Sequence, residues 1–225
     1  RTPRTRASPP DGDWPTFRCD NSRSDSTAVL LPPDLTERWS TALAGPLTAV
    51  VVADGRLYVA QRELNTLHTL NAGNGRTIWS YTACGRIDSP PTVHHGRVYF
   101  GAADGWMYCL LADDGTLVWR FRVAPEDRQI VAYNRLESVW PVHGSILVRD
   151  GSDGRPTAYA SAGRTSYVDR GVFLVGVDAV TGAAKFRRNI FHMDPDTGNE
   201  DQGTIKGVSM PGAIADVLAS DGKSI

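Results

Sequence analysis

Two stretches of this sequence share one pattern: residues 70–79 read LNAGNGRTIW and residues 111–119 read LADDGTLVW. In both, a glycine lies four residues before the closing tryptophan, at Gly75 and at Gly115. The two tryptophans are 40 residues apart, and Trp39 lies another 40 residues upstream. A fixed spacing indicates an internal repeat, and about 40 residues is the size of one four-stranded propeller blade.

A third, degenerate copy of the pattern follows later in the chain. It reads VDAVTGAAKF, with Gly182 four residues before Phe186, and an insertion separates it from the second copy. Each copy is preceded by a glycine-containing turn and a short apolar run, and these runs read LYVA, VYFGA and AYASA. Turn residues that bound such short runs predict β-strands. In the second unit we expect strands near residues 91–94, 97–102, 106–111 and 116–123.

These units predict an all-β fold, a β-propeller of four-stranded antiparallel blades. A single four-stranded sheet leaves two apolar faces uncovered, whereas blades packed face to face around an axis bury both faces. Aromatic rings bury large areas and glycine permits close approach, so this pairing fits the joints between blades. The residues that we expect to dock neighbouring blades are Trp39, Trp79, Trp119, Phe186, Gly75, Gly115 and Gly182.

The repeat divides the chain into a leader and part of a propeller. Residues 1–33 are rich in proline, serine, arginine and aspartate, and are predicted to form a linker that is partly disordered. A strand over residues 35–41 is expected to complete the last blade of a longer propeller. We expect blades at about 46–82, 89–123 and 138–189, and the start of a further blade at 212–225.

Composition and charge disfavour several classes of protein. The 225 residues carry 24 Lys and Arg against 25 Asp and Glu, so bulk charge gives no reason to expect a nucleic acid as partner. No segment approaches the roughly 18 consecutive apolar residues of a membrane helix. Three cysteines, Cys19, Cys84 and Cys109, show no CxxC spacing. Free thiols are the expectation, and one disulfide stays open as an alternative.

The turn, the glycine and the tryptophan four residues beyond it resemble the pyrroloquinoline-quinone (PQQ)-type propeller repeat. The stretches 88–110 and 162–182 carry the resemblance most clearly, and the nearest likeness is to noncatalytic propellers of bacterial envelopes, such as the outer-membrane protein assembly factor propeller. The resemblance implies eight blades, or roughly 320–400 residues at this period. It therefore implies that this sequence is a fragment with about three complete blades, and that the protein is periplasmic or otherwise extracytoplasmic.

Charged and hydrogen-bonding side chains gather at two places in the repeat. Arg86 and Asp88 precede the first strand of the second blade, which starts beside the propeller axis. Arg164, Tyr167 and Asp169 lie in a loop that follows a central strand. Because binding groups of propellers collect on the axial faces, these residues are predicted to form a polar funnel. The alternative is that the Arg and Asp side chains only tie adjacent blades together.

Three long loops interrupt the period, at residues 124–139, 163–171 and 190–209. Long loops inside a compact repeat are often functional, and a variable surface excursion is the alternative.

The chain offers two sets of residues of the types that bind metals. His94 and His95 are adjacent, so on a strand they would point to opposite faces, and no shared metal site is expected. An acidic loop has Ile205 where an EF-hand places its twelfth-position glutamate, so the loop is predicted to be solvated. Its carboxylates are Asp194, Asp196, Glu200 and Asp201.

The sequence and the resemblance together predict a noncatalytic scaffold or binding module with no cofactor. Its expected partner is a protein or a carbohydrate, bound on a propeller face or along an exposed strand edge. The alternative is part of a PQQ-dependent dehydrogenase that also binds calcium. Many alcohol-oxidising members of that class place two adjacent cysteines over the cofactor, and this sequence has no adjacent pair.

Overall fold

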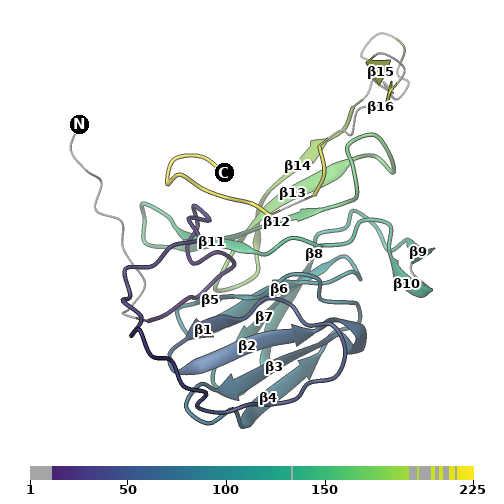
Figure 1. Cartoon of the computed structure of the whole chain (residues 1–225). Coiled ribbons are helices and arrows are strands. Elements are labelled where there is room, and N and C mark those ends of the chain that lie inside the picture. Colours follow the sequence, from purple (N-terminus) through teal and green to yellow (C-terminus); the bar gives the residue numbers. More distant parts are fainter. Residues whose placement is uncertain are drawn as a thin grey trace.

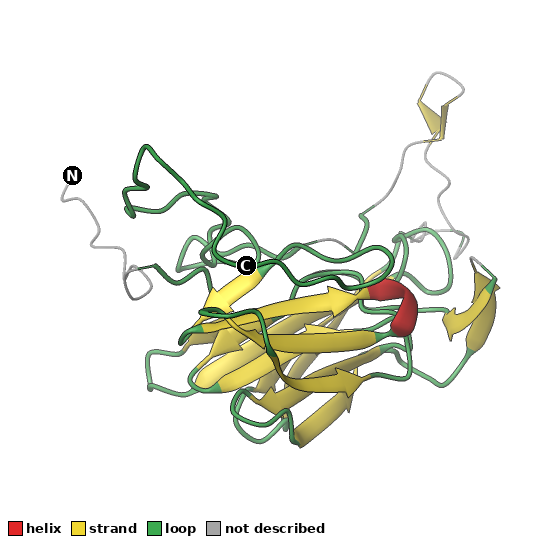
Figure 2. Ribbon diagram, turned by 60° about the horizontal axis from the view of Figure 1, so that its bottom comes forward, coloured by secondary structure: helices red, strands yellow, loops and turns green. Residues whose placement is uncertain are grey.

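The computed structural model describes residues 12–132, 134–192, 197, 204–205, 208–209, 213–215 and 217–225. Three four-stranded antiparallel sheets stand side by side, each with its strands in sequence order (Figure 1). Figure 2 shows the same part of the chain as strands and loops with a single short helical turn. The all-β prediction is confirmed, and the sheets are the blades of a β-propeller.

The strand bounds follow the turns that the sequence marks. The first sheet holds β1 (Val51–Ala53), β2 (Arg56–Gln61), β3 (Thr66–Asn71) and β4 (Thr77–Thr82), with a 3-10 turn, η1 (Arg62–Leu64), between β2 and β3. The second holds β5 (Thr92–His94), β6 (Arg97–Gly101), β7 (Trp106–Leu111) and β8 (Leu117–Arg122). The third holds β11 (Leu147–Asp150), β12 (Pro156–Ala162), β13 (Val172–Asp178) and β14 (Ala184–Ile190). Two hairpins stand apart, β9 (Gln129–Ala132) with β10 (Arg135–Ser138), and β15 (Thr204–Ile205) with β16 (Val208–Ser209).

The middle sheet buries both of its faces, as a blade between two others must. Side chains alternate across a strand, so Phe100 on β6 packs into the core shared with the first sheet and Tyr99 into the core shared with the third. On β7, Tyr108 and Cys109 divide between the same two cores. Two continuous apolar layers therefore hold the three sheets together.

Each joint between sheets contains one tryptophan laid across one glycine. Trp79 is 8% exposed, and its Nε1 donates to the carbonyl of Ala112 at 2.9 Å. A Cβ at Gly115 would lie 2.6 Å from the Trp79 ring, and Gly115 has a φ of 75°. Only glycine suits both the left-handed backbone and the close approach of the ring.

The same geometry recurs on both sides of this joint. Trp39 donates to the carbonyl of Ala72, at 3.0 Å, and its ring lies over Gly75. Trp119 donates to the carbonyl of Ala179, at 3.1 Å, and its ring lies over Gly182. In every case the accepting carbonyl lies three residues before the glycine, so the sequence spacing specifies one repeated contact.

Phe186, the fourth aromatic residue of the pattern, has a different neighbour. It pairs across the sheet with Gly176 on β13 and lies 6.0 Å, ring to ring, from Tyr159 on β12. Within the described part of the chain, Phe186 therefore packs on its own sheet. Its docking onto a following blade stays a prediction.

From Trp14 onward, the predicted linker or leader at residues 1–33 packs against the sheets. Trp14 exchanges two backbone hydrogen bonds with Val52 on β1, and the amide of Val93 on β5 donates to Pro15. The Asn21 side chain then donates to the carbonyl of Val148 on β11 at 2.7 Å. This stretch therefore makes hydrogen bonds to backbone groups on β1, β5 and β11, the first strands of the three sheets. It covers strand edges that would otherwise lack hydrogen-bond partners.

Three predicted boundaries also differ from the structure. Residues 35–41 form no strand, because their contacts with Ala72 and Gly75 come from the side chains of Trp39 and Thr41, and no backbone ladder to another strand forms among the described residues. The third sheet begins at Leu147 rather than near 138, since residues 139–146 form a connection whose Trp140 is fully buried. Gly212 lies outside the described residues, and the described part of 213–225 contains no strand.

Candidate functional site

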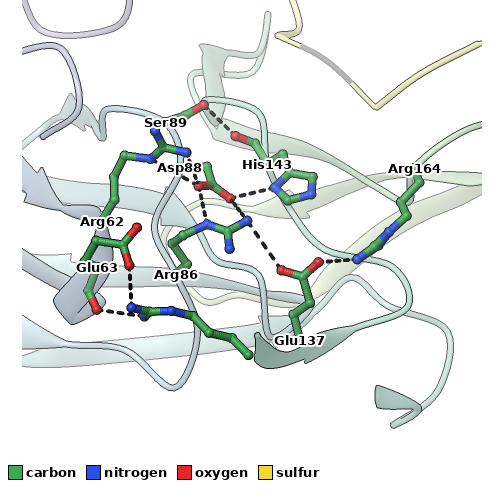
Figure 3. A network of polar contacts seen from close by, with 9 residues as sticks. Arg62, Glu63, Arg86, Asp88, Ser89, Glu137, His143 and Arg164 are labelled. Carbon is green, nitrogen blue, oxygen red and sulfur yellow. Dashed lines mark hydrogen bonds and ion pairs between the residues drawn. The ribbon is translucent and has the colours of Figure 1, made fainter. Parts of the chain in front are cut away.

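Charged and hydrogen-bonding side chains gather where the chain enters the second and third sheets, and we call this group the polar cluster (Figure 3). Its members come from the β2–β3 turn, the segment before β5, strand β10, the segment before β11 and the loop after β12. They are Arg62, Glu63, Arg86, Asp88, Arg135, Glu137, His143 and Arg164.

Asp88 is the centre of the polar cluster. Its Oδ1 accepts from Arg86 Nε at 2.6 Å and from Arg62 Nη2 at 3.0 Å. Its Oδ2 lies 2.7 Å from Nδ1 of His143. Arg62 comes from the first sheet, Arg86 from the entry to the second and His143 from the entry to the third. One carboxylate therefore connects all three sheets.

These hydrogen bonds determine the charge of Asp88. Burial alone would raise the pKa of this carboxyl, but hydrogen bonds from His143, Arg86 and Arg62 outweigh burial and hold the pKa well below its ordinary value. The same contact with Asp88 raises the pKa of Arg86. Asp88 is therefore a carboxylate, and Arg86 a cation, throughout the neutral range.

Glu137 on β10 is a second buried carboxylate of the polar cluster. Its Oε1 accepts a hydrogen bond from Arg164, and its Oε2 lies 3.4 Å from Nη2 of Arg86. Arg164 also donates to the backbone carbonyl of Val139 at 3.3 Å. Glu137 thus fastens the β9–β10 hairpin to groups at the entry of the second sheet and in the third.

Arg135 provides a further anchor for the hairpin. It forms an ion pair with the Glu63 side chain in η1, and its Nη1 donates to the Glu63 carbonyl at 2.7 Å. A two-stranded ribbon is marginally stable by itself in water. The contacts of Arg135 and Glu137 therefore fix this ribbon against the sheets.

A cavity of about 250 Å³ lies within the polar cluster. Two buried oxygen atoms in its wall, Oδ1 of Asn65 and Oε2 of Glu137, have no hydrogen-bond partner among the described residues. Such acceptors can take a hydrogen bond from water or from a neutral or cationic donor. The cavity is lined by Asn65, Gly85, Arg86, Ala103, Arg135, Leu136 and Glu137.

The structure divides the predicted polar funnel into two groups. Arg86, Asp88 and Arg164 meet in the polar cluster. Asp169 instead pairs with Arg128 at 2.5 Å, and its carbonyl accepts from Trp140 Nε1. Tyr167 packs its ring on His192, 4.8 Å between centroids. The contacts of Arg86 and Asp88 match the structural alternative, in which such side chains tie blades together.

Sequence reasoning missed Glu137 and His143, although the repeat held a signal for the first. Residues 86–89 read RIDS and residues 135–138 read RLES, so an Arg-x-acid-Ser pattern precedes the first strand of two successive sheets. No comparable signal marks His143, which reaches Asp88 only because the entries to both sheets lie side by side.

The remaining predictions about single residues have mixed outcomes. Within the described residues no disulfide joins any of the three cysteines, and burial raises the pKa of the Cys109 thiol to about 11. The four carboxylates of the acidic loop lie outside the described residues. The argument that separated His94 from His95 is wrong, because both side chains reach the same carboxylate, that of Asp150. The two side chains meet because His95 has a positive φ and so does not continue the strand geometry of His94.

The fold and its repeated joint define this chain as a β-propeller of the PQQ-type repeat class. A family model described as outer membrane protein assembly factor BamB matches residues 25–202. The chain belongs to this family. No helix in the described part of the chain has the length and apolar character to cross a bilayer.

The relatives include quinoprotein dehydrogenases, outer membrane protein assembly factor BamB and, over 89 residues, a serine/threonine-protein kinase of Deinococcus radiodurans. The chain is 26% identical over 209 residues to the quinohemoprotein alcohol dehydrogenase of Comamonas testosteroni, covering 84% of this chain and 27% of the relative. It is 31% identical over 107 residues to the outer membrane protein assembly factor BamB of Escherichia coli, covering 40% of this chain and 27% of the relative. This chain therefore spans about a quarter of the length of either protein.

Solved structures support the fold. A quinohemoprotein alcohol dehydrogenase from Pseudomonas putida HK5 superposes with a TM-score of 0.65 at 22% identity, over 87% of this chain and 28% of that one. The enzyme from Comamonas testosteroni gives a TM-score of 0.63 at 24% identity, over 84% of this chain and 29% of that one. At these identities the likeness shows the propeller fold alone.

Proposed function

We propose that this chain belongs to a noncatalytic propeller that binds a protein partner in the bacterial cell envelope, through the face that carries the β9–β10 hairpin. The observation that carries the proposal is the orientation of this hairpin. Glu137 on one face of the ribbon is 3% exposed and anchored in the polar cluster. The other face points an aliphatic pair at solvent.

The aliphatic pair consists of Val131 and Leu136. They are directly opposite each other in the antiparallel register, so their side chains lie on one face of the ribbon. Val131 is 74% exposed and Leu136 is 67% exposed. We take these adjacent exposed aliphatic side chains, held on an anchored element, as the contact site for the partner. Apolar groups of this kind favour a protein over a carbohydrate as the partner.

The polar cluster supports this function by positioning the hairpin. Its charges are largely used on one another, since Asp88 pairs with Arg62 and Arg86, and Glu63 with Arg135. A cluster of this kind contributes rigidity, and a preorganised surface loses less entropy when a partner binds. The envelope location rests on the family and on the names of its members.

The second candidate function is that of a PQQ-dependent dehydrogenase, favoured by the dehydrogenases among the relatives. The residues of the cavity do not fit that cofactor. PQQ carries carboxylate groups, and the cavity presents to it the buried carboxylate of Glu137, whose Oε2 already faces Nη2 of Arg86 at 3.4 Å. Both guanidinium groups in the wall, Arg86 and Arg135, already face carboxylates of this chain.

A capture experiment tests the proposal. The full-length protein is immobilised and exposed to envelope extract, and captured proteins are identified by mass spectrometry for the parent and for V131D/L136D. The control is L30D/L31D, which places the same charges on exposed leucines outside the hairpin. We expect V131D/L136D to capture at least about 10-fold less of a specific partner than the parent does, because an unpaired carboxylate is costly to bury in an apolar contact.

Two results would contradict the proposal. Equal capture by V131D/L136D and the parent would remove the hairpin as the binding surface. Saturable, stoichiometric uptake of PQQ with calcium by the full-length protein, together with dye reduction in the presence of an alcohol, would replace the binding module with an enzyme.

A further inference from the structure

Three metal-ligating side chains converge at the opposite end of β5 from the polar cluster. His94 is the last residue of β5, His95 follows in the turn to β6, and Asp150 is the last residue of β11 in the third sheet. Nε2 of His94 lies 3.0 Å from Oδ1 of Asp150, and Nε2 of His95 lies 3.5 Å from the same oxygen. One ligand atom from each residue fits within a group whose members all lie within 4.8 Å of one another.

The backbone of the turn brings the two histidines together. Neighbouring residues on a strand point to opposite faces, but the strand ends at His94. His95 has a φ of 46° and Gly96 a φ of 68°, so both residues adopt the left-handed conformation. The turn rotates the His95 side chain to the side of His94, and the ring centroids lie 4.1 Å apart.

We propose that His94, His95 and Asp150 form a binding site for a divalent ion of the zinc class, which joins the second and third sheets. Two imidazoles and a carboxylate are ligands that such ions accept. With metal–ligand bonds of about 2.0–2.1 Å, ligand atoms around a tetrahedral ion lie roughly 3.3–3.4 Å apart. The separations of 3.0 Å and 3.5 Å bracket this value.

The ligand set leaves a coordination position open. Three protein ligands plus water or another donor complete a four-coordinate site. His94 is half-buried between the sheets, whereas His95 and Asp150 are exposed, so an ion can enter from solvent and keep an outward-facing position. Soft or nitrogen-preferring ions are favoured over Mg²⁺ and Ca²⁺, which take oxygen ligands.

The repeat itself shows that this ligand set is not a requirement of the fold. The equivalent turn of the first sheet holds Asp54 and Gly55, and Asp54 also has a positive φ, of 52°. That turn forms without any histidine. Turn geometry therefore does not by itself account for a pair of histidines at the second turn that faces a carboxylate across the joint.

Zinc titration of the full-length protein tests the site. The exposed thiol is first removed by Cys84→Ser, because it would bind zinc independently. Metal-free protein is titrated with Zn²⁺ against a chromophoric chelator, and with Co²⁺ by visible absorption. We expect one Zn²⁺ per chain, with an intense Co²⁺ spectrum typical of four-coordinate geometry.

The variants His95→Ala and Asp150→Asn remove ligands at exposed positions where the fold does not depend on them, and His94→Ala removes the half-buried one. Each is expected to weaken zinc binding at least about 10-fold, the lower end of what loss of even a hydrogen bond to a metal ligand costs. His192→Ala, an exposed histidine in contact with Tyr167, is the matched control and keeps the parental affinity.

A stability measurement accompanies the titration, because a ligand that binds only the folded state raises the unfolding temperature. The parent is expected to unfold at a higher temperature with zinc, and His95→Ala is expected to lose this increase. Absence of stoichiometric zinc uptake by the parent would overturn the proposal. Parental affinity in both His95→Ala and Asp150→Asn would overturn it as well.

Discussion

The joint between the first and second sheets has two ends that are built differently. At one end Trp79 lies across Gly115 and donates to Ala112, in a contact made mainly by packing. At the other end Asp88 accepts hydrogen bonds from Arg62 and Arg86, in a contact made by charge. Both ends hold the same two sheets together, so their differences in chemistry can be compared directly.

The two ends also differ in how they recur. The tryptophan contact appears at Trp39, Trp79 and Trp119, the three tryptophans spaced by the repeat, with the same three-residue offset between carbonyl and glycine. Among the described residues the polar cluster occurs once, and it takes residues from loops that interrupt the period, such as Glu137 and Arg164. The repeated tryptophan contact therefore explains how the sheets pack. The polar cluster, which departs from the repeat, positions the β9–β10 hairpin that we propose as the binding surface.

The largest effect on the comparison is expected from Trp79→Ala. Loss of this buried ring removes apolar contact and leaves a cavity, which costs about 3–5 kcal/mol of unfolding free energy. Trp119→Ala is the matched variant and should cost less, because Trp119 is only half-buried. Urea unfolding followed by tryptophan fluorescence and circular dichroism measures both. An equal or smaller loss for Trp79→Ala would contradict the role given to its burial.

Asp88→Asn tests the charged end of the joint. The amide cannot balance the guanidinium groups of Arg62 and Arg86, so the variant should lose about 2–3 kcal/mol at pH 7. Asp114→Asn, a change of the same kind on an exposed turn, serves as the control and should leave the unfolding free energy close to that of the parent. Unchanged stability of Asp88→Asn in urea would show that the cluster contributes nothing to the joint.

A smaller effect separates ring contact from backbone strain. Gly115→Ala and Gly55→Ala both place a Cβ on a residue with positive φ, at 75° and 69°. The Cβ at Gly115 meets the Trp79 ring, whereas nothing lies within 4 Å of the position at Gly55. We expect both to destabilise, with an additional cost of about 1–3 kcal/mol for Gly115→Ala from overpacking. Thermal unfolding of the pair measures the difference, and equal losses would assign the whole effect to strain.

The fold could be predicted from the sequence because it depends on local, repeated signals. The turns, the short apolar runs and the spacing of glycine to tryptophan gave the strands of the second sheet to within about two residues. Packing of Trp14 on the first sheet could be expected from the sequence, but the contacts of Pro15 and Asn21 with the second and third sheets could not, because their partners are strand edges far along the chain. Composition alone made this segment resemble a linker.

The candidate site was only partly predictable, for the same reason. Arg86 and Asp88 lie two residues apart in the sequence, so both could be placed at the entry to the second blade. Glu137 and His143 reach them through the relative placement of three sheets, which no local pattern encodes. The convergence of His94 and His95 depended on a left-handed turn at a non-glycine residue, a conformation that histidine adopts uncommonly.

The dependence of stability on pH tests most directly whether the two ends of the joint differ as described. The pKa of Asp88 is held below its ordinary value in the folded protein, so its stabilisation is complete above the unfolded pKa of about 4 and declines as the pH falls below it. Unfolding free energies of the parent, Trp79→Ala and Asp88→Asn are measured in urea at pH 7 and pH 3. We predict a constant loss for Trp79→Ala, and for Asp88→Asn a loss that shrinks by about 1 kcal/mol per pH unit below pH 4. A loss for Asp88→Asn that is the same at both pH values would contradict the account.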